Sequence, residues 1–463
     1  MAQFAGSLLY NHKGHEGAQR KSVENRVFVK LRDLRGYAFS GHLSSNCTNA
    51  RQPPKHGIVI KPMDIVVFIP ATGGGALLSR RAFLKTTSAA AILPGAVRSL
   101  LSWAADSGIS IPNKDGLIIR SYRFLDLEIP VEFMTDWITP VNHFFVRNHM
   151  LAPTEVDAAS WKLTISGEVR KPLTLTLADL AKGPVRDITN TLECAGNGRS
   201  LHSPKVPGVQ WGKGAVGNAR FSGPSLKSLL EKAGIKDTAK HVQFRGLDGV
   251  PGNVPAFVRS IPIEKALDGD TLIATHMNGA PIPIHHGYPA RAITPGWVGA
   301  ASCKWLTEIT VLDKPAEGNF MSPGYRFPDT PGKPGEPVKP ENTHSLTALN
   351  VKSLIAAPSD GAKLPAGKHT VQGVAWAGEA DITKVEVSTD GGNRWNPAEL
   401  GRDHAKYAWR LWKYAWKPAK SGSYVILSRA TDSQGRVQPE AAVWNPSGYL
   451  YNAYDQVKVY VQT

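Results

Sequence analysis

Short segments in the middle of the chain alternate between apolar and polar residues. In SWKLTISGEV, the apolar residues Trp161, Leu163 and Ile165 fall on one side of an extended backbone, which is typical of a half-buried strand. KWLTEITVL, residues 304–312, predicts a second strand of this kind. The dipeptide Asn-Gly at 278–279 stands between two apolar runs and predicts a hairpin.

Two other segments follow a helical period. LTLADLAKG predicts a short helix that ends at Gly183. GPSLKSLLEKAG predicts a longer helix with Gly234 as its stop. The apolar face of that helix consists of Leu226, Leu229, Leu230 and Ala233. Strands interrupted by isolated helices indicate an α+β domain, which we place at residues 106–327, and argue against a doubly wound sheet.

The pattern changes after residue 327. Residues 328–345, PDTPGKPGEPVKPENTHS, contain five prolines and are predicted to form a semi-rigid surface linker. In residues 346–463, short alternating segments are separated by turns such as Asp-Gly-Gly at 390–392, which predicts an immunoglobulin-like β-sandwich. The tryptophans of this part are expected in a core or at an interface: Trp376, Trp395, Trp409 and Trp412.

Composition and charge narrow the class of protein. The 463 residues are 42% hydrophobic and 20% charged, as in globular proteins with a substantial core. The formal net charge of +16 suits an anionic partner, but no helix-turn-helix, zinc-finger or RNA-recognition pattern accompanies it, so we expect no nucleic-acid binding. The three cysteines form no C-x-x-C pair, which argues against a zinc knuckle, and no C-x-x-C-H motif for haem attachment is present.

An export signal is predicted well inside the chain. SRRAFLKTTSAAAILPGAV resembles a twin-arginine signal, which we place at residues 79–105 and which predicts export of a folded protein to the periplasm. Its apolar run is too short and too rich in alanine to predict a membrane span. Residues 1–78 are expected to be a disordered extension or the product of a mis-assigned start, with Met63 as the true start.

Cys194, in TLECAGNGRS, is the residue that most needs a chemical explanation. A buried structural thiol is one interpretation, but glycines, an asparagine and an arginine surround it and predict a loop. A protease nucleophile or a redox-active thiol lacks a local signature or a nearby resolving partner. A metal ligand is the fourth interpretation, because one soft thiolate alone suits a metal held mainly by an organic cofactor.

Cationic residues recur in the segments that flank this cysteine. Guanidinium groups bind oxyanions in a bidentate manner, and lysine acts as a point charge. The candidates are Arg147, His149, Arg199, His286, Arg291 and Lys304. Each alone is an ordinary surface charge, but the set indicates an anionic cofactor, an anionic substrate, or both.

Five motifs, in order, resemble the sulfite oxidase family of molybdenum enzymes: FFVRNH, LECAGNGRS, MNGAPIPIHHGYPAR, PGWVGAASCKWL and YAWRLW. The resemblance covers roughly residues 124–463. It implies a molybdopterin-binding catalytic domain at 106–327 and an immunoglobulin-like dimerisation domain at 346–463, and hence a homodimer.

The resemblance also implies roles for individual residues. Cys194 matches the thiolate that ligates molybdenum. The residues implied for the oxyanion pocket are Arg147, Arg199, His149 and Trp211, and those implied for the pterin and its phosphate are His286, Arg291 and Lys304, with His149 as a further candidate. Tyr325, in SPGYRF, falls at the spacing of the family's active-site tyrosine.

Two positions depart from the vertebrate pattern. Gly324 stands where those enzymes have an acidic residue before the tyrosine, and Ser447 stands where they have a further pocket arginine. The haem domain of the vertebrate enzymes is not expected on this chain. The resemblance still implies molybdenum-dependent oxidation of sulfite to sulfate, with electrons passed to a separate acceptor such as a c-type cytochrome.

Two alternatives remain open at this point. One is an enzyme of the same family that acts on another sulfur compound, such as a sulfane-sulfur species or a sulfoxide. The other is an exported binding module that has lost its metal. The loss of one pocket cation at Ser447 keeps the first alternative in view.

Overall fold

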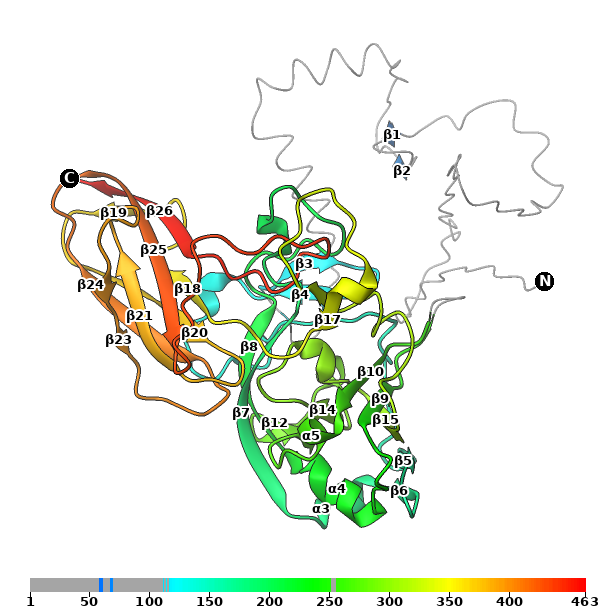
Figure 1. The fold of residues 1–463 in the computed structure, drawn as a ribbon. Coiled ribbons are helices and arrows are strands. Elements are labelled where there is room, and N and C mark those ends of the chain that lie inside the picture. The colour runs from blue at the N-terminus through cyan, green and yellow to red at the C-terminus, as the bar shows by residue number, and fades with distance from the viewer. Residues whose placement is uncertain (1–57, 61–66, 70–110, 112–113, 115, 251–254) are drawn as a thin grey trace, which may run out of the picture. The chain divides into compact units, whose positions relative to one another are not determined.

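The computed structural model describes residues 58–60, 67–69, 111, 114, 116–250 and 255–463 (Figure 1). Two short strands, β1 (Ile58–Ile60) and β2 (Val67–Ile69), pair antiparallel and belong to a unit of their own. The predicted signal at 79–105 lies outside the described residues, as does most of the predicted extension at 1–78. Everything else described belongs to one compact unit that begins at residue 110.

The first domain contains a five-stranded mixed sheet. Its order is β10-β9-β15-β5-β6, and only the β15–β5 pair is parallel. The strands are β5 (Leu163–Gly167), β6 (Leu173–Leu175), β9 (His241–Gly246), β10 (Val258–Pro262) and β15 (Leu306–Leu312). Leu163 and Ile165 are fully buried on one face, so the predicted strand is confirmed.

A second sheet carries the chain to the cysteine. Its order is β13-β12-β8-β7, formed by β7 (Val185–Glu193), β8 (Val216–Pro224), β12 (His276–Met277) and β13 (Ala280–Pro281). Asn278 and Gly279 have φ of 53° and 84° between β12 and β13, so the hairpin prediction is confirmed. β7 ends at Glu193, which directly precedes Cys194.

Small ribbons and short helices complete this domain. The pairs are β3 (Ile118–Ser121) with β4 (Asp126–Glu128), β11 (Leu272–Ala274) with β14 (Arg291–Ile293), and β16 (Arg326–Pro328) with β17 (Thr343–Ser345). The α-helices are α3 (Leu177–Ala181), α4 (Leu226–Ala233) and α5 (Ile263–Ala266). The 3₁₀ turns are η1 (Val131–Phe133), η2 (Arg199–Leu201), η3 (Ile284–His286), η4 (Gly299–Ala301) and η5 (Pro340–Asn342).

The longest helix forms for the reasons that its sequence suggests. The Ser225 hydroxyl accepts from the Ser228 amide and caps the start of α4, and Gly234 ends it at φ 66°. All four predicted apolar residues of its face are buried. No helix in the described part of the chain is long and apolar enough to cross a membrane.

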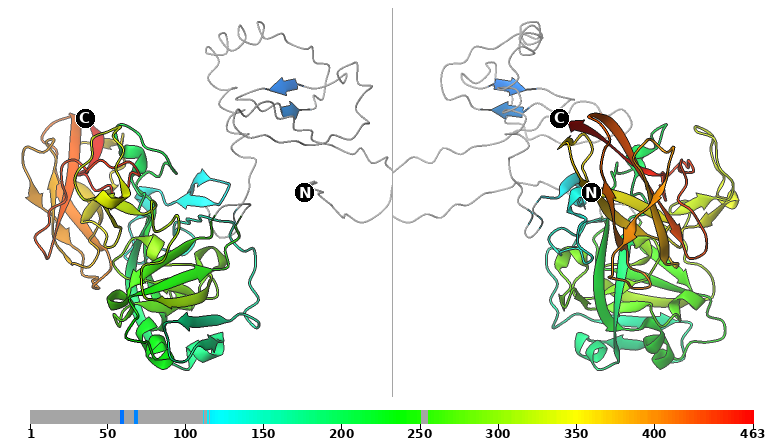
Figure 2. Two further views of the ribbon diagram at one scale, coloured as in Figure 1. Left: turned by 45° about the vertical axis from the view of Figure 1, so that its right-hand side comes forward. Right: turned by 90° about the vertical axis from the view of Figure 1, so that its left-hand side faces the viewer.

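The C-terminal part is the predicted β-sandwich (Figure 2). One sheet has the order β18-β20-β24-β23 and the other β19-β26-β25-β21-β22. The strands are β18 (Lys352–Ala357), β19 (Lys363–Pro365), β20 (His369–Trp376), β21 (Ile382–Ser388), β22 (Asn396–Pro397), β23 (Glu399–Leu400), β24 (Arg410–Trp416), β25 (Gly422–Asp432) and β26 (Asp455–Gln462). An α+β domain followed by a sandwich confirms the predicted fold class.

The tryptophans of the sandwich divide between two places. Trp412 is buried in the sandwich core, whereas Trp376 and Trp409 are fully buried in a cluster shared with the first domain. Trp395 is only half-buried and lies 4.2 Å from the Arg429 guanidinium. The two ends of the proline-rich stretch lie in the paired strands β16 and β17. Residues 328–345 therefore form a loop that is closed by this antiparallel pair.

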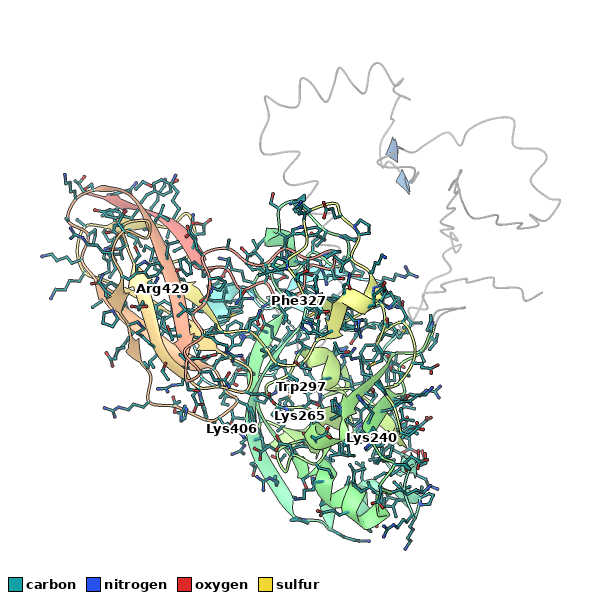
Figure 3. The ribbon with its side chains drawn as sticks, in the orientation of Figure 1. Lys240, Lys265, Trp297, Phe327, Lys406 and Arg429 are labelled. Carbon is teal, nitrogen blue, oxygen red and sulfur yellow. The ribbon has the colours of Figure 1, made fainter. Side chains whose placement is uncertain are left out.

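Buried polar contacts join the two domains. The Glu193 carboxylate accepts from Lys352 at 3.0 Å and from the Trp376 indole at 2.9 Å, and all three are buried. A second junction lies at Lys265, next to Trp297 in Figure 3, where both side chains donate to Glu379. The sandwich therefore reaches the residue directly before Cys194 and holds the end of β7.

Candidate functional site

The loop after β7 is held rigidly around Cys194. The Cys194 amide donates to the Ala215 carbonyl at 2.9 Å, and its own carbonyl accepts from the Asn197 amide at 2.8 Å. The Asn197 side chain bridges Glu193 and the Ala215 amide at 2.9 and 3.0 Å. Because these bonds fix both sides of the loop, the sulfur of Cys194 has a defined position.

Arg199 lies in a slot built from small residues. Its Nε donates to the Ser447 carbonyl at 2.8 Å and its Nη1 to the Val209 carbonyl at 2.9 Å. A Cβ at Gly196 would come within 2.5 Å of the Arg199 Nη2, so only glycine leaves room for this guanidinium. The slot holds the Arg199 guanidinium through backbone carbonyls, and no carboxylate in the described part of the chain forms an ion pair with it.

Arg147 is positioned by an acidic residue that the motifs did not single out. Its Nη1 donates to the Asp126 carboxylate at 3.1 Å and to the Asn148 carbonyl. Asp126 is buried at the start of β4, and burial raises its pKa while the nearby Arg147 opposes that shift. The ion pair fixes one edge of the guanidinium.

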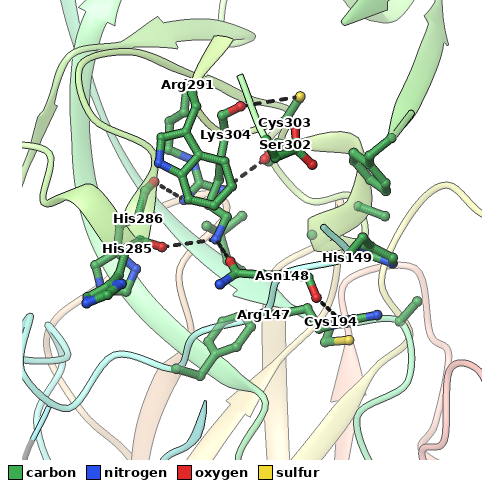
Figure 4. Close-up of a pocket in the computed structure, with 18 of the residues that line it drawn as sticks. Arg147, Asn148, His149, Cys194, His285, His286, Arg291, Ser302, Cys303 and Lys304 are labelled. Atoms are coloured by element: carbon green, nitrogen blue, oxygen red, sulfur yellow. Dashed lines mark hydrogen bonds between the residues drawn. The ribbon is translucent and has the colours of Figure 1, made fainter. Parts of the chain in front are cut away.

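Two cavities meet at the cysteine, and Figure 4 shows residues that line the first of them. The residues that line both are Arg147, His149, Cys194 and Tyr325. One cavity extends to the residues predicted for the pterin and its phosphate, and the other, of about 400 Å³, extends to Arg199, Ser447 and Tyr449. Cys194 therefore stands in the shared wall, with the cavity that reaches Arg291 and Lys304 on one side and the cavity that reaches Arg199 on the other.

The cysteine lies in an electropositive setting. Burial raises the pKa of the Cys194 thiol, and Arg147 and Arg199 oppose that shift. Among the described residues, no group of three or more His, Cys, Asp and Glu side chains comes together as a metal cluster. A metal at Cys194 would therefore take one soft ligand from this protein region and the rest from a bound cofactor.

Tyr325 and His149 form a hydrogen-bonded pair over the cysteine. The Tyr325 hydroxyl bonds to the His149 Nε2, and the imidazole stacks on Phe257 at 4.5 Å. Burial raises the pKa of Tyr325, and desolvation at the cavity wall together with Arg147 lowers that of His149. The pair is therefore neutral at pH 7, with a protonated phenol and an uncharged imidazole.

The far end of the first cavity gathers donors. Arg291 donates to the His286 and Ser302 carbonyls at 2.8 and 2.9 Å, and Lys304 donates to the His285 carbonyl at 3.0 Å and to the Asn148 side chain. Figure 4 shows Lys304 between Arg291 on one side and Arg147 with Cys194 on the other.

The same cavity contains donors that still lack a partner. The Asn148 Nδ2 and the Arg291 Nε are buried and have no hydrogen-bond acceptor among the described residues. Because most of the surrounding side chains are cationic or donors, the cavity suits an elongated group that carries acceptors and a phosphate. These residues fit a pterin cofactor with its metal end at Cys194.

The comparisons with known proteins agree with this geometry. Residues 149–320 match the oxidoreductase molybdopterin binding domain, and residues 343–462 match the Mo-co oxidoreductase dimerisation domain. The mitochondrial sulfite oxidase of Mus musculus is 37% identical over 77% of this chain and 67% of its own length. The chain belongs to the sulfite oxidase family. The resemblance and the enzyme class that the motifs predicted are thereby confirmed.

Other members of the sulfite oxidase family give the same result. The sulfite oxidase of Gallus gallus is 36% identical over 74% of this chain and 78% of its own length. Among solved structures, the sulfane dehydrogenase SoxCD of Paracoccus pantotrophus superposes with a TM-score of 0.64 at 28% identity, over 73% of this chain and 84% of that one. The fold is thus shared by family members that carry different substrate names.

One predicted residue is not in the site. Trp211 is fully buried in an apolar cluster with Phe144 and Phe221, and it lines neither cavity. The Trp211 backbone amide donates to the Val209 carbonyl at 2.9 Å, whereas its buried indole Nε1 has no acceptor among the described residues. The other eight predicted side chains line the two cavities.

Lys114, which sequence reasoning missed, lines neither cavity but contacts the site residue His286. Its Nζ lies 2.7 Å from the His286 Nε2 and donates to the Val141 and Phe144 carbonyls. It belongs to a segment without periodicity or motif, so only the distant contact with His286 identifies it. Burial lowers the pKa of Lys114 to about 7.

Lys114 is expected to give the cofactor-free protein a pH-dependent stability. Its folded pKa of about 7 lies below the unfolded value of about 10.4, so between these pH values the unfolded state binds more protons. The free energy of unfolding should therefore rise with pH across this window in the wild type, relative to Lys114→Met. Chemical denaturation from pH 6 to pH 10 measures the difference. Lys182→Met, at a mostly exposed lysine, is the control, and a pH-independent difference for Lys114→Met contradicts the assignment.

Proposed function

We propose that this enzyme oxidises sulfite to sulfate and passes the electrons to a separate acceptor. The observation that carries the proposal is the position of Cys194, in the wall between a donor-lined cavity and a cavity with two guanidinium groups. The first cavity would hold the molybdopterin cofactor through His286, Arg291 and Lys304, while Lys114 supports His286 from outside its lining. The second would admit a small oxyanion.

The substrate cavity supplies charge and geometry. Arg147 and Arg199 would bind the sulfite oxygens from two sides, since guanidinium groups form charge-assisted bonds with oxyanions. When bound at Cys194, the cofactor supplies the two-electron redox chemistry. The residues of the chain orient the anion with its sulfur toward that centre and keep the surrounding donors in place.

The reaction releases protons near the hydrogen-bonded pair of Tyr325 and His149. Sulfite and water give sulfate, two electrons and two protons. His149 is uncharged and hydrogen-bonded to Tyr325, and because its pKa is lowered it would pass a proton released in the cavity onward and would not retain it. Tyr325 would then orient the imidazole and close the cavity over the reacting centre.

The remaining features concern partners and location. We propose a c-type cytochrome as acceptor, since the basic chain, with net charge +16, favours an acidic docking face and a salt-sensitive rate. The match to a dimerisation domain over residues 343–462 supports a homodimer. The twin-arginine pattern at residues 79–105 supports export to the periplasm.

Sulfite-dependent reduction of ferricyanide, and then of cytochrome c, tests the proposal. The full chain would be purified from a host that makes molybdenum cofactor, and its molybdenum content measured. Rapid reduction at micromolar sulfite is the expected result. A molybdenum-loaded sample that reduces neither acceptor would exclude sulfite as substrate, and a chain that takes up no molybdenum would support the binding-module alternative.

A sulfane-sulfur compound is the second candidate substrate. The substrate cavity has Ser447 in place of a third arginine, and its volume of about 400 Å³ leaves room for a larger anion between Phe320 and Tyr449. The likeness to a solved sulfane dehydrogenase points in the same direction. Thiosulfate and protein-bound sulfane sulfur, assayed beside sulfite on the same preparation, separate the two candidates by their kcat/KM.

A further inference from the structure

A third cavity lies on the other side of Tyr325, between β10 with β9 and the β16–β17 ribbon. Its size is about 220 Å³. The polar residues in its lining are His241, Arg259, Ser260, Ser322, Arg326, Ser345 and Thr347. Arg326 and Ser345 are register partners across the ribbon, which is formed by the two ends of the proline-rich stretch. None of Arg147, Cys194 and Arg199 lines this cavity.

The charges that line this cavity are all of one sign. Arg259 and Arg326 supply guanidinium groups, His241 supplies an imidazole, and no carboxylate is among the described residues that line it. Arg326 is held by the Thr343 hydroxyl at 2.6 Å and reaches the Ser345 hydroxyl at 3.5 Å. Hydroxyl groups next to guanidinium groups are the donor set that binds tetrahedral oxyanions.

Arg259 is the unusual member of the set. It is only 2% exposed, forms no ion pair with any described residue, and its Nε has no hydrogen-bond acceptor. Its one hydrogen bond to a described residue runs from Nη1 to the Phe320 carbonyl. A buried guanidinium without an anion is strongly unfavourable, because desolvation is not repaid by a counter-charge. The π face of Tyr325, 5.1 Å away, compensates only in part.

We propose that this third cavity is a second oxyanion site, which binds sulfate or phosphate against Arg259 and Arg326. A volume of about 220 Å³ holds such an ion together with a few waters, each of which occupies about 30 Å³. Ser322 is exposed at its edge, so the ion enters from solvent and not through the substrate cavity.

Tyr325 and Phe320 connect the site to the catalytic residues. Tyr325 contacts Arg259 with its ring and His149 with its hydroxyl. An anion on Arg259 withdraws positive charge from the phenol ring and from the imidazole beyond it. Bound oxyanion therefore alters turnover without competing for Arg147 and Arg199, and if sulfate is the product of the proposed reaction, it acts here as a regulator.

The test is sulfate binding to the full-length holoenzyme with its substrate cavity disabled. In the R147Q/R199Q background, calorimetry and the sulfate-induced shift in Tm should show one saturable site per chain, with chloride at matched ionic strength as the blank. R259Q added to this background should weaken binding about tenfold or more, since a charge-assisted bond is lost. R245Q, at a half-exposed arginine on the neighbouring strand β9, should leave it unchanged.

Further variants keep the test decisive. If R259Q does not fold, R326Q in the same background must weaken sulfate binding, because both guanidinium groups face the same ion. Phosphate titrated in place of sulfate identifies which of the two ions binds more tightly. Equal sulfate affinity with and without Arg259, or the absence of saturable binding in the R147Q/R199Q background, overturns the proposal. Neither result affects the sulfite assay, so a failure here is distinct from a failure of the proposed function.

Discussion

Replacing Cys194 by serine is expected to abolish sulfite-dependent turnover. The sulfur is the soft ligand in the wall between the two cavities, and a hydroxyl is a harder, weaker donor to molybdenum. Loss of residues that only support a metal ligand costs about 10- to 100-fold in activity, so loss of the ligand itself should cost at least about 100-fold. Steady-state kcat with sulfite and ferricyanide, normalised to molybdenum content, measures the effect.

The other described cysteine provides the matched control. Cys303 lines the same cavity but is 2% exposed, and its Sγ lies 3.6 Å from the Lys304 carbonyl, a bond that a serine hydroxyl can also make. Cys303→Ser should therefore reduce turnover far less than Cys194→Ser. Pterin content should be preserved in both variants, because the donors at the far end of the cavity are unchanged. More than a few per cent of wild-type turnover in molybdenum-loaded Cys194→Ser would remove Cys194 as the ligand.

The pattern of apolar residues and turn residues was sufficient to predict those strands, helices and turns that depend on neighbouring residues in the sequence. The strand around Leu163 and Ile165, the capped helix that ends at Gly234 and the Asn278-Gly279 hairpin all follow from periodicity and turn chemistry. These features depend on neighbours within a few residues, so the printed sequence contains their cause.

The site depends on contacts that no local pattern contains. Arg199 is held by the carbonyl of Ser447, 248 residues later in the chain, and Lys114 meets His286 across 172 residues. Asp126 has no motif and is recognisable as a site residue only once it lies beside Arg147. Packing of the two domains brings Arg199 to Ser447, and tertiary packing within the first domain forms the other two pairs, so only the folded structure reveals them.

Trp211 is a residue that a motif predicted for the site but that lines neither cavity. The motif GVQW matched the family pattern and implied a pocket residue, but the ring lies in the buried apolar cluster against which Cys194 packs. Its carbonyl accepts from the Ser200 amide at 3.0 Å, so the residue supports the loop that bears Arg199. A motif fixes the path of the backbone more firmly than it fixes which way a side chain points.

Arg147→Gln is expected to raise the KM for sulfite by about 10- to 100-fold and to change kcat much less. A charge-assisted hydrogen bond contributes about 1.5–3 kcal/mol, and each 1.4 kcal/mol corresponds to about tenfold in binding. Because Arg147 would contact oxygens that carry charge both in bound sulfite and in the transition state, its loss weakens both states alike. Initial rates over a range of sulfite concentrations at constant ionic strength give the two parameters.

The ion pair with Asp126 must be separated from the effect on substrate. Removing Arg147 leaves a buried carboxylate unpaired, 3.1 Å from the vacated position, and this alone lowers the free energy of unfolding. The double variant Arg147→Gln/Asp126→Asn removes both charges, so it should recover stability while the raised KM persists. Arg147→Lys, which keeps the charge but loses the planar fork, should fall between the wild type and Arg147→Gln in KM. An unchanged KM in the stability-corrected double variant would mean that sulfite does not contact Arg147, and the oxyanion would then have to be bound by Arg199 alone.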